Sequence, residues 1–396
     1  MEYRLEELFD LQMGKTPSRS VTEYWESGNN KWISIADLSK CGKYIYDTKE
    51  CLSDIAVSES GIKQIPANTV VMSFKLSIGK TAITSEPMYS NEAIMSFRDR
   101  KLVQLLPEYI YYLLLSKNWD DGTNKAVMGK TLNKATLSKV KVNIHSMQEQ
   151  QEIVYVLNQA TALIELHQQQ LQKLDELVKA RFVELFGDPV GNPKAYYVAT
   201  LQELICKGYI TYHLDGNHGG DYPKSDEFVE TGIPYISANC IVNGEVDFAK
   251  AKYLTSERAN KLRKGIAQNG DVLFAHNATV GPTVVLHTTE KKVILGTSLT
   301  AYRCDKEKIL PNYLKTYMLS DGFVRQYSNE MKQTTRNQVP ITAQKRYLFL
   351  IPPIELQNQF ATFVEQVDKS KLQVPSGNAL CIRYPIFIEM MFLRGV

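Results

Sequence analysis

The sequence predicts a mixed α/β (α+β) fold in which two tandem globular domains are separated by long helices that form an antiparallel coiled coil. Three observations support this fold: a long heptad pattern in the middle of the chain, an internal repeat that relates its two halves, and short apolar runs between Gly and Asn turns outside the heptads. The repeat predicts a pseudo-twofold relation of the halves. The expected segments are a first domain, a long central helix, a second domain, a second and apparently truncated long helix, and an atypical C-terminal tail, at residues 1–145, 146–186, 187–353, 354–374 and 375–396.

The central segment 146–186 is the most regular part of the chain. Its seam positions recur at alternating steps of four and three residues, at Ile153, Leu157, Ala160, Ile164, His167, Leu171, Leu174, Val178, Arg181 and Leu185. A period of about 3.5 residues keeps one seam facing the same partner, as in a coiled coil. No Pro or Gly occurs before Gly187, so this helix extends over about 60 Å at about 1.5 Å per residue. We expect the polar seam residues His167 and Arg181 to fix the register.

The composition is that of a soluble globular protein. Of its 396 residues, 44% are hydrophobic and 22% are charged, and the formal net charge is only +3. No stretch approaches about 18 uninterrupted apolar residues and the N-terminus lacks a signal-peptide core, so a cytosolic protein without a membrane segment is expected. The six cysteines are scattered without a C-x-x-C pair, which predicts reduced thiols rather than disulfides or a zinc site.

The first domain is expected to alternate short strands and helices. The sequence predicts a helix, two strands, a second helix and a further strand at Leu5–Phe9, Lys31–Ala36, Thr69–Phe74, Pro107–Ser116 and Lys139–Ile144. Before the last strand, residues 125–134 are expected to form a loop that holds three lysines and no acidic residue. Such a loop suits contact with the phosphates of a nucleic acid.

Motifs of the first half recur in the same order in the second half. The matched pairs are 79–81 with 281–283 (Gly-x-Thr), 106–109 with 310–313 (Leu-Pro-x-Tyr), Thr131 and Asn133 with Thr335 and Asn337 of a second basic loop, and 146–150 with 353–357 at the start of each long helix. Two copies of a domain followed by a helix indicate a duplication rather than a solenoid. We expect the two helices to pack against each other and to hold the domains apart.

Two patterns that suggest enzyme chemistry are incomplete. The Gly-Lys-Thr triplets at 79–81 and 129–131 lack the glycine that a P-loop requires five residues before the Gly-Lys pair, where Phe74 and Asn124 stand instead. Asp271, Glu290 and Lys292 loosely match the metal-binding pattern of some nucleases, but an exposed turn explains them as well. No cofactor or metal site is indicated, and nothing suggests chemistry by this chain alone.

The start of each domain carries a family resemblance. Residues 14–19, 24–25 and 32–33 of the first domain, and 215–219 and 233–236 of the second, resemble the start of target-recognition domains in the specificity subunit (HsdS) of type I restriction-modification systems. Together with the order of domains and helices, the resemblance extends over about residues 1–372. It implies a non-catalytic subunit without a cofactor, whose two domains each read one half of a split double-stranded DNA target. The helices then set the spacer and bind two methyltransferase subunits and, through them, restriction subunits.

The candidate DNA-binding residues lie in the basic loops and at the domain starts. They are Lys15, Arg19, Lys75, Lys80, Lys130, Asn133, Lys134, His218, His276, Asn277, Lys332, Thr334, Arg336 and Asn337. Lysine and arginine suit phosphate contacts, and Asn, Thr, His and Arg side chains can also address base edges.

The chain departs from the family pattern after Gln373. The Pro375-Ser376-Gly377 run is expected to break the second helix, and 386–392 is apolar without a helical pattern, so we expect a tail without helical order. Two other function classes stay open from the sequence: a stand-alone nuclease or methyltransferase-type enzyme, and a structural coiled-coil adaptor. For any single basic loop, a solvated surface turn is the simpler interpretation.

Overall fold

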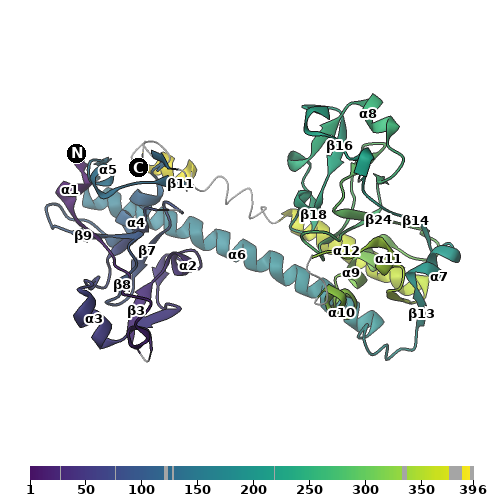
Figure 1. The fold of residues 1–396 in the computed structure, drawn as a ribbon, viewed down its shortest axis with the longest axis horizontal. Coiled ribbons are helices and arrows are strands. Elements are labelled where there is room, and N and C mark those ends of the chain that lie inside the picture. Colours follow the sequence, from purple (N-terminus) through teal and green to yellow (C-terminus); the bar gives the residue numbers. More distant parts are fainter. Residues whose placement is uncertain are drawn as a thin grey trace. The chain divides into compact units, whose positions relative to one another are not determined.

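The computed structural model describes residues 1–26, 28–75, 77–119, 124–126, 129–217, 219–331, 337–373 and 386–392. The chain divides into two compact units, Met1–Gln169 with Pro375–Val396, and Gln170–Val374. A single 40-residue helix, α6 (Met147–Phe186), begins in the first unit and ends in the second (Figure 1).

The first unit alternates short strands and helices before α6. Its elements are β1 (Glu2–Arg4), α1 (Leu5–Leu8), β2 (Phe9–Met13), β3 (Asn30–Ile33), α2 (Ile35–Leu38), β4 (Tyr44–Ile45), β5 (Glu50–Leu52), α3 (Asp54–Ser60), β6 (Val70–Ser73), β7 (Thr81–Thr84), β8 (Tyr89–Ser90), β9 (Ile94–Asp99), α4 (Pro107–Leu115), β10 (Asn124–Ala126), β11 (Gly129–Thr131), α5 (Lys134–Ser138) and β12 (Lys141–Asn143). A further helix at 386–392 belongs to the same unit.

The second unit repeats this order with longer connections. Its elements are β13 (Tyr197–Thr200), α7 (Leu201–Cys206), β14 (Ile210–Asp215), β15 (Phe228–Val229), β16 (Ile233–Ile236), β17 (Ile241–Val242), β18 (Glu245–Val246), β19 (Lys252–Leu254), α8 (Ser256–Lys261), β20 (Ile266–Ala267), β21 (Val272–Ala275), β22 (Thr283–Val285), β23 (Val293–Leu295), β24 (Leu299–Cys304), α9 (Pro311–Met318), α10 (Asp321–Met331), α11 (Ile341–Gln344), β25 (Leu348–Ile351) and α12 (Ile354–Gln373).

The first unit is built on a five-stranded sheet of order β2-β9-β6-β7-β4, in which only β4 and β7 run parallel. Helix α4 packs on β6 and β7. Apolar side chains of α1, α4, α5 and the start of α6 fill the main core against this sheet. A smaller sheet, β5-β3-β8, packs with α3 around a separate cluster. Burial of these apolar faces is the main stabilising contribution.

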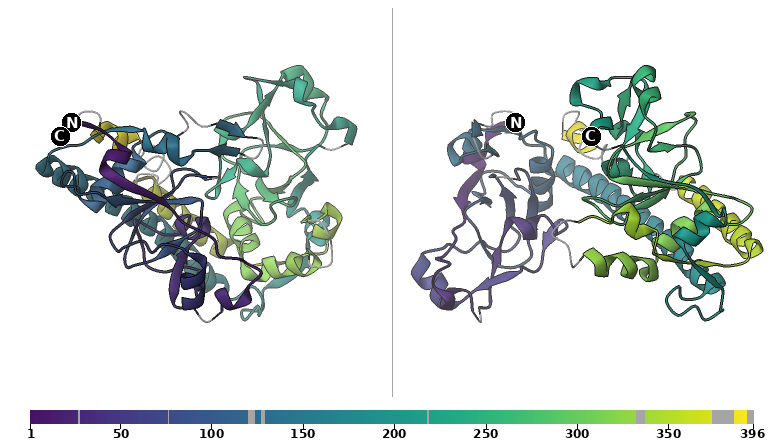
Figure 2. Two further views of the ribbon diagram at one scale, coloured as in Figure 1. Left: turned by 60° about the vertical axis from the view of Figure 1, so that its left-hand side comes forward. Right: turned by 45° about the vertical axis from the view of Figure 1, so that its right-hand side comes forward.

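The second unit has the same topology with different sheet edges. Strands β14-β24-β21-β22 form its central sheet, and β15-β19-β16-β23-β20 form the second sheet. Helix α9 packs beside α12 and against β21 and β22. The two helices also lie side by side in the two turned views of Figure 2. The two central sheets have equivalent strands in equivalent positions, apart from β4. The predicted mixed α/β fold with an internal repeat is therefore confirmed.

Several predicted elements of the first unit are confirmed and two need correction. The helices expected at residues 5–9 and 107–116 and the strand expected at 69–74 are α1, α4 and β6, with bounds that differ by one residue at most. The strand predicted at Lys31–Ala36 ends at Ile33, because Ser34 starts α2: its hydroxyl accepts a hydrogen bond from the amide of Asp37 (3.3 Å).

The predicted loop at 125–134 is wrong in its conformation. Strands β10 and β11 pair there as an antiparallel hairpin, and helix α5 begins at Lys134. The short strands have little apolar content, so the loop composition concealed them.

The predicted seam of α6 is confirmed. Ile153 and Leu157 are fully buried, and the later seam positions are partly buried while most positions between them are exposed. In the second unit α12 packs antiparallel on this seam: Lys371 Nζ lies 2.6 Å from Asp175 Oδ1, and the ring of Phe360 lies 5.5 Å from that of Phe182. From Asp175 to Phe182 the residue numbers rise along α6, while those of the contacting residues fall from Lys371 to Phe360 along α12, so the two helices run antiparallel.

The tail expectation is wrong for residues 386–392. This segment is helical, and Ile388 is buried in the main core of the first unit. Two turns are too short to show a helical period in the sequence, and packing rather than propensity stabilises so short a helix. The predicted interruption at residues 375–377 lies outside the described residues.

Candidate nucleic-acid interface

Each unit presents a β-hairpin turn of the same construction. Gly79 follows β6 with φ 88°, and Gly281 follows β21 with φ 117°, a backbone conformation that favours glycine. Two residues later, the hydroxyl of Thr81 donates to the carbonyl of Gly79 (3.0 Å), and that of Thr283 donates to the carbonyl of Gly281 (2.9 Å). The Gly-x-Thr repeat therefore encodes a turn. Because this turn joins two antiparallel strands and opens no helix, it has no P-loop geometry.

In the first unit a backbone hydrogen bond joins this turn to the start of α5. The amide of Leu132 donates to the carbonyl of Phe74 (3.1 Å). The bond brings Lys75, which follows Phe74, beside the segment that leads into Lys134. Lys75 is partly buried, with its Nζ 5.2 Å from the centre of the Phe74 ring, whereas Lys80 and Lys134 are exposed. Among the described residues, no hydrogen bond or ion pair engages the ammonium group of either exposed lysine.

The second unit makes the same connection. The amide of Val339 donates to the carbonyl of His276 (2.8 Å), and the amide of Ala278 donates to the carbonyl of Asn337 (3.0 Å). The structure thus brings together three predicted site residues, His276, Asn277 and Asn337. His276 is only 2% exposed, while Asn277 is partly exposed and Asn337 exposed.

These bonds correct one pairing of the sequence repeat. Leu132 and Val339 occupy equivalent positions, and the next residues, Asn133 and Pro340, are both N-caps of short helices. The predicted match of Asn133 with Asn337 is therefore wrong by three residues. The Asn133 side chain accepts a hydrogen bond from the amide of Thr136 (2.7 Å), so this candidate caps α5.

A buried amide network behind the second-unit turn was not predicted. Gln344 of α11 is fully buried; its Oε1 accepts from the hydroxyl of Tyr302 (2.5 Å) and from His213 Nε2 (3.1 Å). Its Nε2 donates to the hydroxyl of Thr300 (3.1 Å) and to the carbonyl of Val339 (3.2 Å). Gln344 therefore ties strands β14 and β24 to the segment that holds the turn. A single polar residue in a four-residue helix gives no periodic signal of such a role.

Burial keeps His213 uncharged. Desolvation lowers the pKa of His213 to about 4. A neutral ring that donates from Nε2 matches the acceptor Oε1 of Gln344, which fixes the tautomer.

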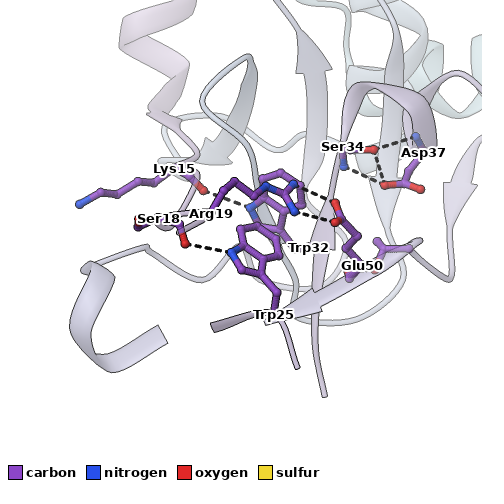
Figure 3. Close-up of polar contacts among 9 residues, drawn as sticks. Lys15, Ser18, Arg19, Trp25, Trp32, Ser34, Asp37 and Glu50 are labelled. Atoms are coloured by element: carbon purple, nitrogen blue, oxygen red, sulfur yellow. Dashed lines mark hydrogen bonds and ion pairs between the residues drawn. The ribbon is translucent and has the colours of Figure 1, made fainter. Parts of the chain in front are cut away.

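Arg19 is engaged within the first unit (Figure 3). Its guanidinium donates to both carboxylate oxygens of Glu50 (2.6 and 2.9 Å) and lies 3.6 Å from the centre of the Trp25 ring. The hydrogen bonds to Glu50 raise the pKa of Arg19. Trp32 Nε1 donates to the carbonyl of Lys15 (3.0 Å), so both early candidates belong to one aromatic cluster. Because the Arg19 guanidinium forms two hydrogen bonds to Glu50 and stacks on the Trp25 ring, it anchors this cluster.

The remaining candidates are placed only in part. His218, Lys332, Thr334 and Arg336 lie outside the described residues, and of Lys130 only the backbone, in β11, is described.

The loose nuclease pattern does not form a site. Asp271 accepts two hydrogen bonds from Arg303 (2.8 Å each), and Lys292 Nζ donates to Asn260 Oδ1 (2.6 Å). Within the described part of the chain, no group of three or more His, Cys, Asp or Glu side chains is placed to hold a metal ion. None of the described helices is both long enough and apolar enough to span a bilayer.

Comparison with known proteins agrees with this architecture. The family model of the type I restriction modification DNA specificity domain matches residues 1–176 and 213–376. The type I restriction enzyme MjaIX specificity subunit of Methanocaldococcus jannaschii is 23% identical over 374 residues, which cover 91% of this chain and 85% of that protein. The HindI specificity subunit of Haemophilus influenzae is 26% identical over 162 residues, which cover 40% of this chain and 34% of that protein.

Solved structures share the fold. The S subunit of a type I restriction-modification system from M. genitalium superposes with a TM-score of 0.55 at 14% identity, covering all of this chain (100%) and 96% of that one. A chain from a study of complex assembly in a type I system gives a TM-score of 0.56 at 14% identity, covering 100% of this chain and 98% of that one. The two matched ranges each include a globular domain and all or most of the long helix that follows it, and this leaves one assignment. The chain belongs to the family of type I restriction-modification DNA specificity subunits (HsdS), which are DNA-recognition subunits and not catalytic ones.

Proposed function

We propose that this protein reads a bipartite DNA target. Residues 1–145 and 187–353 each recognise one half of a split double-stranded sequence. The long helices α6 and α12 set the spacer between the halves and dock two methyltransferase subunits, through which restriction subunits join the complex.

One observation supports this proposal best. Both units form the same hairpin turn and join it by a backbone hydrogen bond to the start of a short helix, but the side chains around this turn differ between the units. The first unit presents Lys75, Lys80 and Lys134 there, and the second presents Asn277 and Asn337. Lysines neutralise phosphates, whereas Asn amides pair with base edges, adenine above all. A shared backbone with different side chains is what two readers of different half-sites require.

A second observation supports the docking of helical partners. The face of α6 away from its seam carries large exposed apolar side chains, at Tyr155, Leu163, Leu166, Leu177 and Val183. Apolar side chains that gather on one exposed helix face mark a protein interaction surface.

Exchange of the first domain tests the assignment of the half-sites. Residues 1–145 are replaced by the first domain of another family member, the subunit is assembled with its methyltransferase subunits, and methylated sites are mapped across a genome. One half-site should change, while the other half-site and the spacer stay the same. The reciprocal exchange of residues 187–353 is the control, and it should change only the other half-site.

Two results would contradict the proposal. A change of both half-sites on exchange of one domain would show that the domains do not read independently. Failure of the assembled complex to bind any duplex would favour a purely structural adaptor.

A further inference from the structure

In the second unit, the parallel strands β16 and β23 end at the same edge of their sheet. Their register pairs Ile236 with Leu295, and the amide of Gly296 donates to the carbonyl of Ile236 (2.8 Å). Because the strands are parallel, the residues that follow β16 lie beside those that follow β23. The segment after β16 is a single 3-10 turn, Ala238–Cys240.

Ser298 joins this 3-10 turn to the hairpin turn of the candidate interface. Its hydroxyl accepts a hydrogen bond from the amide of Ala238 (2.8 Å), and its carbonyl accepts one from the amide of His276 (2.9 Å). The carbonyl of His276 accepts in turn from the amide of Val339 (2.8 Å), and Asn277 is the next residue along the chain. A continuous series of hydrogen bonds therefore holds the 3-10 turn close to Asn277.

The first unit makes the two equivalent backbone bonds. The amide of Asn91 donates to the carbonyl of Ile33 (3.1 Å), and the amide of Phe74 donates to the carbonyl of Ala93 (3.0 Å). Strands β3 and β8 run parallel here, as β16 and β23 do in the second unit. These shared bonds align the two units residue by residue without reference to their side chains.

Ala36 and Asn239 occupy one position in this alignment. Each stands three residues after the end of its strand, which is Ile33 for β3 and Ile236 for β16. Both are exposed, and both belong to the short helical segment that follows the strand. The motifs of the sequence repeat do not include this pair, because the two side chains have no chemistry in common.

The side chain of Asn239 is not engaged in the way that Asn133 is by its helix cap. The Oδ1 of Asn239 lies 3.8 Å from the Sγ of Cys240, which is a weak donor, and among the described residues its Nδ2 donates no hydrogen bond. An exposed Asn amide can pair with the N6 and N7 edge of adenine. The methyl group of an alanine, as at Ala36, suits contact with the methyl group of thymine.

We infer that Asn239 is a specificity-determining residue of the second domain, which contacts a base edge of the second half-site, adenine above all. Ala36 holds the equivalent position toward the first half-site. This inference rests on the proposed function and adds to it a position outside the basic loops. It places Asn239, Asn277 and Asn337 around one hydrogen-bonded turn.

Variants at this position are assembled with the methyltransferase subunits, and methylated sites are mapped across a genome. Asn239→Ala removes both hydrogen-bonding groups of the side chain. One base position of the second half-site should therefore become degenerate, with discrimination falling about tenfold, while the first half-site and the spacer stay the same. Gln268→Ala is the matched control: it removes an exposed amide that precedes β21, whereas Asn277 follows β21, and both half-sites should stay unchanged.

Asn239→Asp separates a lost base contact from a damaged fold. The substitution keeps the shape of the side chain but replaces the amide donor by an acceptor. The preferred base at the same position of the second half-site should shift toward cytosine, whose N4 amino group donates to carboxylates. A new preference can be recorded only from a folded, active complex.

Ala36→Asn is the reciprocal variant in the first unit. It places an amide at the equivalent position, so the preference at one base position of the first half-site should change and the second half-site should not. An unchanged first half-site would refute the equivalence of Ala36 with Asn239.

An unchanged second half-site in both Asn239 variants, or an equal loss of discrimination in Gln268→Ala, would overturn the inference. Its failure is distinguishable from failure of the proposed function. If exchange of residues 187–353 transfers the second half-site and the Asn239 variants change no base position, the domain still reads DNA and only the role of Asn239 is refuted. If exchange of one domain changes both half-sites, the proposed function itself is refuted.

Discussion

Replacing Gln344 by Met tests whether the buried amide network holds the second unit together. Met fills a similar length and volume but offers neither the amide donor nor its oxygen. The change leaves four buried groups without their partner: the hydroxyls of Tyr302 and Thr300, His213 Nε2 and the carbonyl of Val339.

The expected cost follows from those four groups. An unsatisfied buried polar group costs about 1–3 kcal/mol, and neighbouring losses are not additive, so we expect a destabilisation of about 4 kcal/mol. That is a large share of the stability of an ordinary domain, which is about 5–15 kcal/mol.

The distribution of tryptophan provides the assay. All three tryptophans, Trp25, Trp32 and Trp119, lie in the first unit. In urea, selectively excited tryptophan fluorescence therefore follows the unfolding of the first unit, whereas far-ultraviolet circular dichroism follows the unfolding of both units. Gln344→Met should move the dichroism transition to lower urea and leave the fluorescence transition in place.

Two further variants sharpen the test. Gln359→Met changes an exposed glutamine of α12 and should alter stability by less than about 0.5 kcal/mol. Adding Tyr302→Phe to Gln344→Met should recover part of the loss, because it removes one of the orphaned hydroxyls. A Gln344→Met loss below about 1 kcal/mol, or an equal shift of the fluorescence transition, would refute the assignment of these hydrogen bonds as stabilising.

Three other predictions address DNA contact, spacing and pH. Lys80→Ala and Lys134→Ala should each weaken binding of the assembled complex to all duplexes and reduce the log–log salt slope by about one, measured by fluorescence anisotropy; an unchanged slope would remove the residue from the interface. Four residues inserted near Gln169 lengthen α6 by about 6 Å and keep the seam nearly in phase, so methylation mapping should find a spacer longer by about one or two base pairs. Two inserted residues instead rotate the seam by about 200° and should abolish activity. An active four-residue variant with the original spacer would refute the role of α6 in setting the spacer. Burial lowers the pKa of His213 to about 4, so its neutral ring contributes its full stabilisation of the second unit above about pH 6.5, and up to about 3 kcal/mol of the unfolding free energy is lost as the pH falls toward 4. His213→Phe should flatten the dependence of the unfolding free energy on pH across this window. An unchanged pH profile would show that His213 does not titrate there.

The sequence by itself determined the long helix and the duplication. A coiled-coil seam is visible because its period is a local property of the chain, and the burial of Ile153 and Leu157 follows it. The repeat is visible because equivalent turns need the same residues, as Gly79 and Gly281 show through their positive φ angles.

The tertiary structure alone decided which polar side chains are committed to the fold. Arg19 and Asn133 belong to residue types that bind DNA, yet one is bonded to Glu50 and the other caps α5. Whether a polar group faces a partner or solvent depends on segments far away in sequence, and no local pattern records that.

The tertiary structure also decided that residues 386–392 form a helix. The six apolar residues of 386–392, interrupted only by Glu389, show no usable period, and a helix of two turns is not stable alone in water. Its order comes from the core around Tyr109, which is nearly three hundred residues away in the chain. Contacts over such a distance can be recognised only once the two segments are seen side by side.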